Sequence, residues 1–194
     1  TIVLVTDTIP INVGYIASYL DKNLKDQIEI KLFKYPNELL KELKDNPPDI
    51  LGLSNYSWNS NLSEMFARIG KKINPNLMVI QGGTNIPHEI DEKKKFLINR
   101  PATDVYAMFE GERSALNFVK RFIETRDNPK LFFESPIDGC VFIHPDTRGT
   151  EDPKFVVGKY LDRIKDLDEI PSPYLNGMLD KFFDGKLRPF IETN

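Results

Sequence analysis

Short apolar runs alternate with longer stretches of helical period through the first two thirds of the chain. Five runs, rich in β-branched or other large apolar residues, predict strands at residues 2–5, 28–33, 50–54, 77–81 and 104–108. The stretches between and after them predict helices at residues 13–24, 36–44, 62–73 and 114–123. This alternation is typical of an α/β fold with a doubly wound parallel five-stranded sheet.

The pattern changes beyond about residue 125 to short strands and turns. Asp138-Gly139 is a turn signal, and residues 140–143 and 155–157 predict a hairpin. The prolines of Ile170-Pro171-Ser172-Pro173 then stiffen a linker. We therefore expect an α/β domain over residues 1–127, and a small appendage of hairpin and linker over residues 128–194.

The charged run 91–95 predicts a solvated loop or a helix end.

Charge and composition exclude several classes of partner. The formal net charge is −3 and the lysines are spread along the chain, so we expect no direct binding of nucleic acid. No apolar run approaches the length of a membrane span. Cys140 is the only cysteine, which excludes an internal disulfide and favours the cytoplasm. His88 and His144 have no cysteine or carboxylate at metal-binding spacing, and we expect no catalytic or metal-ligating residue here.

Two strand-end loops carry polar and aromatic residues. In a doubly wound sheet the ligand crevice lies outside the carboxyl ends of the strands. After the first predicted strand, Asn12 and Gly14 begin a helix whose free amides can receive an anion or an amide, although a plain helix cap also explains Asn12. After the third predicted strand, residues 54–61 contain the only tryptophan, Trp58, among hydroxyl and amide groups. This loop suits a large planar or amide-decorated ligand. Alternatively, Trp58 packs beneath the loop while Ser60 or Asn61 caps the next helix.

The two later strand ends are rich in glycine. Gly82-Gly83-Thr84 follows the fourth predicted strand, and Gly111-Glu112 follows the fifth. Glycine allows a bulky ligand to approach the backbone closely, although a tight turn and helix capping are simpler explanations. The glycine fingerprints of dinucleotide and nucleoside triphosphate sites are missing.

In this order, the strand-end motifs resemble the N-terminal cobalamin-binding domain of cobalamin-dependent radical SAM enzymes. The resemblance rests on Val13-Gly14-Tyr15, Gly52-Leu53-Ser54, Trp58-Asn59, Gly82-Gly83 and Gly111-Glu112. It implies a Rossmann-like fold and a cobalamin site. The implied site residues are Asn12, Gly14, Ser54, Asn55, Tyr56, Trp58, Asn59, Gly82, Gly83, Thr84, Gly111 and Glu112.

The chain departs from the family pattern at two points. Where some cobalamin domains carry Asp-x-His-x-x-Gly, this chain has Ile9 and Ile11 in the aspartate and histidine positions, so cobalamin is expected without a protein histidine ligand. The Cys-x-x-x-Cys-x-x-Cys motif is absent, so the 4Fe–4S cluster, S-adenosylmethionine and the radical SAM barrel would belong to a missing region that follows residues 190–194.

The leading hypothesis is therefore a cobalamin-binding region excised from a radical SAM enzyme. It would not be catalytic alone, and it would support methyl transfer or related radical chemistry in the full-length protein. The alternative hypothesis is a scaffold or substrate-recognition module of the same architecture that has lost cobalamin.

Overall fold

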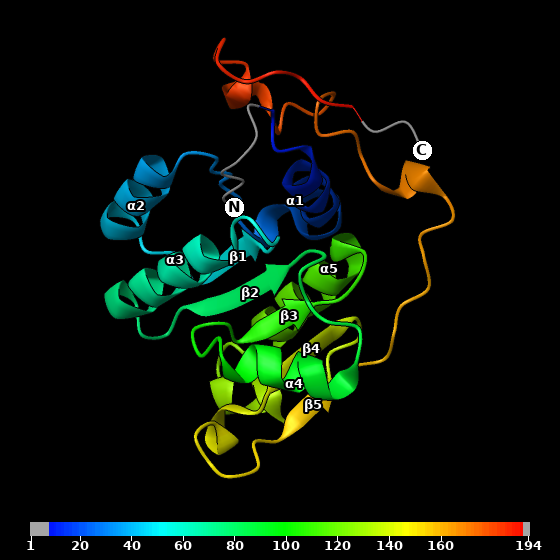
Figure 1. Cartoon of the computed structure of the whole chain (residues 1–194). Coiled ribbons are helices and arrows are strands. Elements are labelled where there is room, and N and C mark those ends of the chain that lie inside the picture. The colour runs from blue at the N-terminus through cyan, green and yellow to red at the C-terminus, as the bar shows by residue number, and fades with distance from the viewer. Residues whose placement is uncertain (1–7, 192–194) are drawn as a thin grey trace.

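The computed structural model describes residues 8–191 and contains a five-stranded sheet in the order β1-β2-β3-β4-β5 (Figure 1). The first three strands are parallel, β4 is antiparallel to β3, and β5 is antiparallel to β4. The strands are β1 Ile50–Ser54, β2 Met78–Gly82, β3 Val105–Ala107, β4 Cys140–Ile143 and β5 Phe155–Val157. The α/β fold class, Rossmann-like in character, is therefore confirmed.

Within residues 8–191, five α-helices and five short 3-10 segments accompany this sheet. The α-helices are α1 Ile11–Leu24, α2 Pro36–Asp45, α3 Ser60–Ile73, α4 Ile90–Ile98 and α5 Gly111–Glu124. The 3-10 segments are Lys25–Gln27, Pro129–Phe133, Pro145–Thr147, Leu167–Glu169 and Asp180–Phe182. Helix α2 begins with a proline, whose missing N–H is not needed in the first turn. Helix α4 occupies the charged run 91–95. No helix within residues 8–191 is both long and apolar enough to span a membrane.

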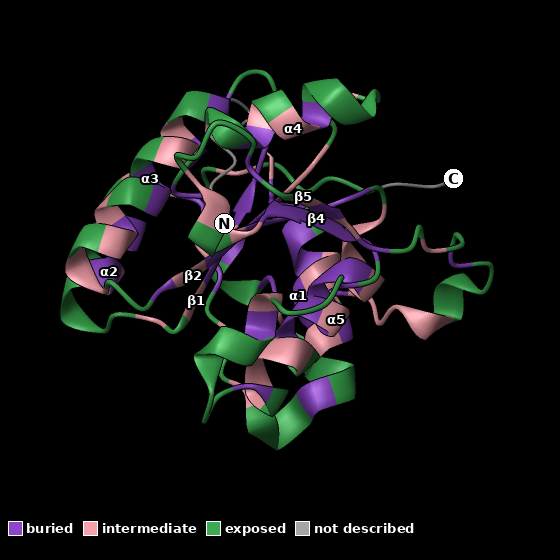
Figure 2. Ribbon diagram, turned by 90° about the horizontal axis from the view of Figure 1, so that it is seen from below, coloured by how far each residue is buried: buried purple, intermediate pink, exposed green. Residues whose placement is uncertain are grey.

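Helices cover both faces of the sheet because side chains alternate along each strand (Figure 2). Ile80, Val105 and Phe142 face a core that includes residues of α1 and α5. On the other face, Leu51 and Val79 pack against α2 and α3, while Tyr106, Val141 and Ile143 pack against Leu97 of α4.

The predicted hairpin is confirmed, but it also extends the main sheet. Tyr106 and Ala107 of β3 pair with Val141 and Cys140 of β4. The buried side chains of β4 alternate between the two cores of the sheet. A boundary near residue 127 stays a prediction.

The predicted strand at residues 28–33 is not part of a ladder in the described residues. Its predicted neighbour at residues 2–5 lies outside them, as do residues 192–194. Residues 28–33 instead form an extended segment whose Leu32 packs with Val13 of α1 and Leu179. The segment after residue 172 thus returns over α1, and Thr8 forms a parallel bridge with Arg188.

Candidate ligand site at the strand ends

The register of the sheet brings three polar loops together. Ser54 pairs with Gly82, and Gly82 pairs with Ala107, so β1, β2 and β3 end side by side. The start of α1 joins the same edge, where Asn12 Nδ2 donates a hydrogen bond of 3.3 Å to the hydroxyl of Tyr56. The structure therefore gathers the residues that follow the strands at one edge, as expected for parallel strands.

Two aromatic rings form a flat surface on the loop after β1. The rings of Tyr56 and Trp58 are stacked, with centroids 4.8 Å apart and planes 5° apart. The side chain of Trp58 is 54% exposed, so it does not pack beneath the loop. An exposed aromatic surface of this kind can stack on a planar ligand or cover the apolar face of a large one.

Asn59 holds the turn that carries these rings. Its Nδ2 donates to Ser54 Oγ at 3.0 Å, and its Oδ1 accepts from the backbone N–H of Tyr56 at 2.7 Å. Asn59 is the N-cap residue of α3 but makes no side-chain capping bond, and Ser60 Oγ instead accepts from Arg100 Nη2 at 2.8 Å. Helix capping by Ser60 therefore does not explain this polar sequence.

Asn55 joins the loops after β1 and β2 from beneath. This residue is fully buried, its Nδ2 donates to Gln81 Oε1, and its Oδ1 accepts from Asn85 Nδ2 at 2.8 Å. Its backbone N–H donates to the carbonyl of Gly82 at 2.6 Å. The amide of Asn55 therefore fixes the spacing of the two loops.

Gly83 lies where these loops come closest. Its φ of +134° is in a region that side chains rarely adopt, and a Cβ here would lie 2.4 Å from the carbonyl oxygen of Asn55. Tyr106 donates a hydrogen bond of 3.0 Å to the carbonyl of Gly83. Burial raises the pKa of the Tyr106 hydroxyl far above its usual range, so this donor stays neutral. Gly82 and exposed Thr84 flank the turn.

Two glycines of the implied site serve helix packing in this structure. A Cβ on Gly14 would lie 3.0 Å from both Pro173 and Leu179, and a Cβ on Gly111 would lie 2.6 Å from Ile16 Cδ1. These glycines let α1 approach the C-terminal segment and α5, respectively. Glu112 lies in the first turn of α5, where its carboxylate is attracted to the positive end of the helix dipole.

Several polar residues beneath the loops were missed by sequence reasoning. Gln81 and Tyr106 lie in apolar strand runs, and Arg100 follows the unpredicted helix α4. The guanidinium of Arg100 stacks 3.6 Å from the ring centre of Phe96, and burial lowers its pKa. The sequence signal that could have found Gln81 is a single polar residue within an apolar run just before Gly82-Gly83.

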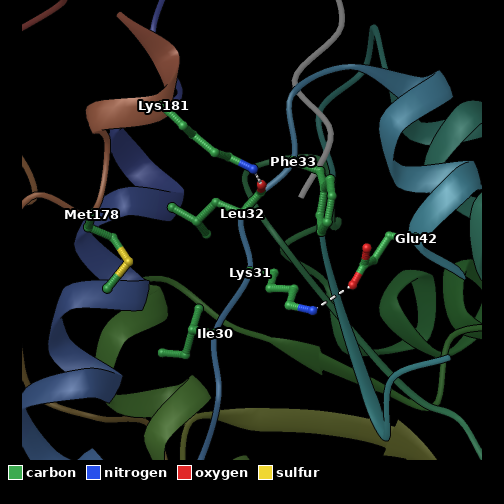
Figure 3. Close-up of a pocket in the computed structure, with 7 residues that line it drawn as sticks. All are labelled: Ile30, Lys31, Leu32, Phe33, Glu42, Met178 and Lys181. Carbon is green, nitrogen blue, oxygen red and sulfur yellow. Dashed lines mark hydrogen bonds and ion pairs between the residues drawn. The ribbon is translucent and has the colours of Figure 1, made fainter. Parts of the chain in front are cut away.

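Two cavities of about 360 and 470 Å³ lie away from the strand ends. The first is lined by Ile30, Lys31, Leu32, Phe33, Glu42, Met178 and Lys181 (Figure 3). There Lys31 pairs with Glu42 at 2.7 Å, and Lys181 donates to the carbonyl of Leu32. The second is lined by Tyr35, Asn37, Glu38, Lys181, Phe182, Asp184 and Lys186. Neither cavity includes a strand-end residue. Within residues 8–191, no group of three or more histidine, cysteine, aspartate or glutamate side chains could hold a metal ion.

Known proteins give an independent view of this chain. No protein-family model matches it. The cobalamin-dependent radical SAM methyltransferase TokK of Streptomyces tokunonensis is 34% identical over 135 residues, or 69% of the chain. A 2-(S-pantetheinyl)-carbapenam-3-carboxylate methyltransferase of Streptantibioticus cattleyicolor is 34% identical over 134 residues, again 69% of the chain. The match covers only 17% of each relative. The chain is therefore similar to a limited part of these methyltransferases.

Proposed function

We propose that this chain is the cobalamin-binding region of a radical SAM methyltransferase, with the cofactor seated at the carboxyl ends of β1, β2 and β3. The observation that carries the proposal is the exposed Tyr56–Trp58 stack on the loop after β1, a flat surface on which a planar ring can lie. The similarity to a cobalamin-dependent methyltransferase supports the choice of ligand.

The residues at this edge fit a large ring bordered by amide groups. Trp58 and Tyr56 offer apolar ring surface, and Thr84 offers an exposed hydroxyl. Asn55, Asn59 and Ser54 are buried and hold the loops in place, so they would orient the site from below. When bound, cobalamin would supply a carrier for the methyl group.

The start of α1 offers no imidazole to cobalt. Ile11, at the position of the histidine in the Asp-x-His-x-x-Gly pattern, is buried in the first turn of α1. In this proposal Tyr56 and Trp58 would hold the ring by stacking, and the polar groups of the loops would hydrogen-bond its edge. The protein would orient the cofactor and exclude water, and it would leave the difficult chemistry to the cofactor.

The chemistry of methyl transfer belongs to the rest of the proposed enzyme. The iron–sulfur cluster and S-adenosylmethionine need residues that this chain does not contain, including three closely spaced cysteines. Their barrel would be the partner of this region within one polypeptide. Reading the gene beyond Asn194 for those cysteines tests this part of the proposal.

Cobalamin binding can be tested with the chain alone. The purified protein is mixed with hydroxocobalamin, free ligand is removed on a sizing column, and the visible spectrum of the protein peak is recorded. We expect a corrin band at a one-to-one ratio with protein. A colourless peak would contradict binding by this chain.

The second candidate is a scaffold or substrate-recognition module of the same architecture. Ile11 in place of histidine and the buried, hydrogen-bonded side chains of Asn55 and Asn59 favour it, because all three are explained by folding alone. A folded protein that stays colourless with hydroxocobalamin would support this alternative.

A further inference from the structure

Gln81 has a buried hydrogen-bond donor without an acceptor. This residue is fully buried in β2, one position before the strand ends at Gly82. Its Oε1 accepts from Asn55 Nδ2, but its Nε2 has no hydrogen-bond partner among the described residues. Most buried polar atoms in proteins are paired, because an unpaired one loses its bonds to water without replacement. The unpaired Nε2 therefore needs an explanation.

A chain of side-chain amides sets the direction of this donor. Asn85 Nδ2 donates to Asn55 Oδ1, and Asn55 Nδ2 donates to Gln81 Oε1. Asn55, in the middle, thus accepts on its oxygen and donates from its nitrogen. This series of amides begins in the loop after β2 and ends at Gln81. The two N–H groups of Gln81 are therefore the donors at its buried end.

The surroundings of Gln81 belong to the strand-end site. Gln81 is in register with Tyr106 of β3 and Leu53 of β1, directly beneath the Gly82-Gly83 turn. In the described residues no acceptor meets Gln81 Nε2, and the neighbouring Tyr106 hydroxyl donates to the Gly83 carbonyl. We propose that Gln81 Nε2 donates a hydrogen bond to an acceptor oxygen of the ligand bound at the strand ends.

This inference rests on the proposed function, and it names the chemistry of one ligand contact. Cobalamin offers two sources of acceptor oxygen, the carbonyl groups of its corrin amides and the phosphate of its nucleotide. Because Gln81 is fully buried, this proposal requires the loops after β1 and β2 to move apart when the ligand binds. Two hydrogen bonds from Asn85, of 2.8 and 3.4 Å, hold those loops together through Asn55.

The test replaces only the donor. Gln81→Glu conserves size and keeps the oxygen that accepts from Asn55, but it places an oxygen where Nε2 stands. Gln27→Glu, at an exposed glutamine, is the matched control. Dissociation constants are measured for hydroxocobalamin and for cobinamide, which keeps corrin amides but lacks the phosphate and nucleotide. We expect Gln81→Glu to weaken hydroxocobalamin binding by about tenfold, and Gln27→Glu to leave it unchanged.

The two ligands distinguish the sources of the acceptor. Equal weakening for both places the acceptor on the corrin amides, whereas weakening for hydroxocobalamin alone places it on the phosphate. If Gln81→Glu fails to fold by circular dichroism, Gln81→Met, which conserves volume without any polar atom, takes its place. Unchanged affinity for both ligands in a folded Gln81 variant overturns the inference. Failure of the unmodified protein to bind either ligand overturns the proposed function itself, and the Gln81 inference with it.

Discussion

At the scale of single residues, Gly83 is a position in the strand-end loops where the backbone leaves almost no room for a side chain. Gly83→Ala would strain φ and push a Cβ against the Asn55 carbonyl. We expect it to lower the free energy of unfolding by about 1–3 kcal/mol and to weaken cobalamin binding, because both loops must move. Urea unfolding and titration with hydroxocobalamin measure these effects.

Gly149→Ala is the control for backbone strain alone. Gly149 has a similar left-handed φ of +86°, but an added Cβ there would meet no atom within 4 Å. It should therefore destabilise the protein through strain and leave cobalamin binding intact. Equal loss of binding in both variants would show that strain anywhere weakens the site, and would remove the special role given to Gly83.

Trp58 is expected to contribute to binding and little to folding. Because its ring is largely exposed, Trp58→Ala should change the free energy of unfolding by less than about 0.5 kcal/mol. Loss of the stacked surface should weaken cobalamin binding by about tenfold. Titration followed by the visible spectrum measures this effect, with the exposed Leu131→Ala as a control. Full affinity in Trp58→Ala would rule out the ring as a binding surface.

The Cys140 thiol should make stability depend on alkaline pH. Burial raises its pKa from 9.0 to about 12, so the folded protein keeps a proton that the unfolded chain releases. The stabilisation is complete below pH 9 and is lost as pH rises from 9 towards 12, by at most about 1.4 kcal/mol per pH unit. Urea unfolding of the protein and of Cys140→Ala at pH 8 and 10.5 measures it. The stability advantage of the unmodified protein should shrink at the higher pH, and a constant difference would contradict this assignment.

At the scale of secondary-structure elements, hydrophobic runs predicted β1, β2 and β3 because both faces of these strands are buried. Residues 28–33 have the same kind of run, yet they form no ladder within the described residues, since pairing depends on a neighbouring strand and not on composition alone. Helix α4 was missed because the lysines and acids of residues 91–95 obscure its apolar positions, including fully buried Leu97.

The loops of the site were less predictable than the strands. Trp58 stands out in the sequence because it is the only tryptophan and lies in a polar loop. Gly14, Gly83 and Gly111 are all glycines near strand ends, and they lie against Leu179, the Asn55 carbonyl and Ile16, respectively. A single sequence does not distinguish a glycine that admits a ligand from one that admits a neighbouring helix.

The hairpin of β4 and β5 should be a cooperative part of the sheet. Phe142 is fully buried and its ring lies 5.3 Å from that of Phe133. We expect Phe142→Ala to lower the free energy of unfolding by about 3–5 kcal/mol while unfolding stays a single transition. Circular dichroism and tryptophan fluorescence in urea should give coincident curves. Two separate transitions would instead favour an independent appendage beginning near residue 128.

At the scale of the whole molecule, segments far apart in the sequence close over α1. Leu179 is fully buried among Ile9, Val13 and Phe182, and it also contacts the face of α1 at Gly14. Ile9 further donates its backbone N–H to the carbonyl of Arg188 at 2.9 Å. The C-terminal segment therefore belongs to the folded unit, although its sequence reads as a linker rich in proline and glycine.

This closure predicts a large difference between two leucines four residues apart. Leu179→Ala should lower the free energy of unfolding by about 2–5 kcal/mol, because it leaves a cavity between α1 and the C-terminal segment. Leu175→Ala should have almost no effect, since Leu175 is 91% exposed. Urea unfolding of the two variants measures the difference. Equal stabilities would mean that the C-terminal segment does not pack on α1 in solution, and the start of α1, which carries Asn12, would then lose its support from Leu179.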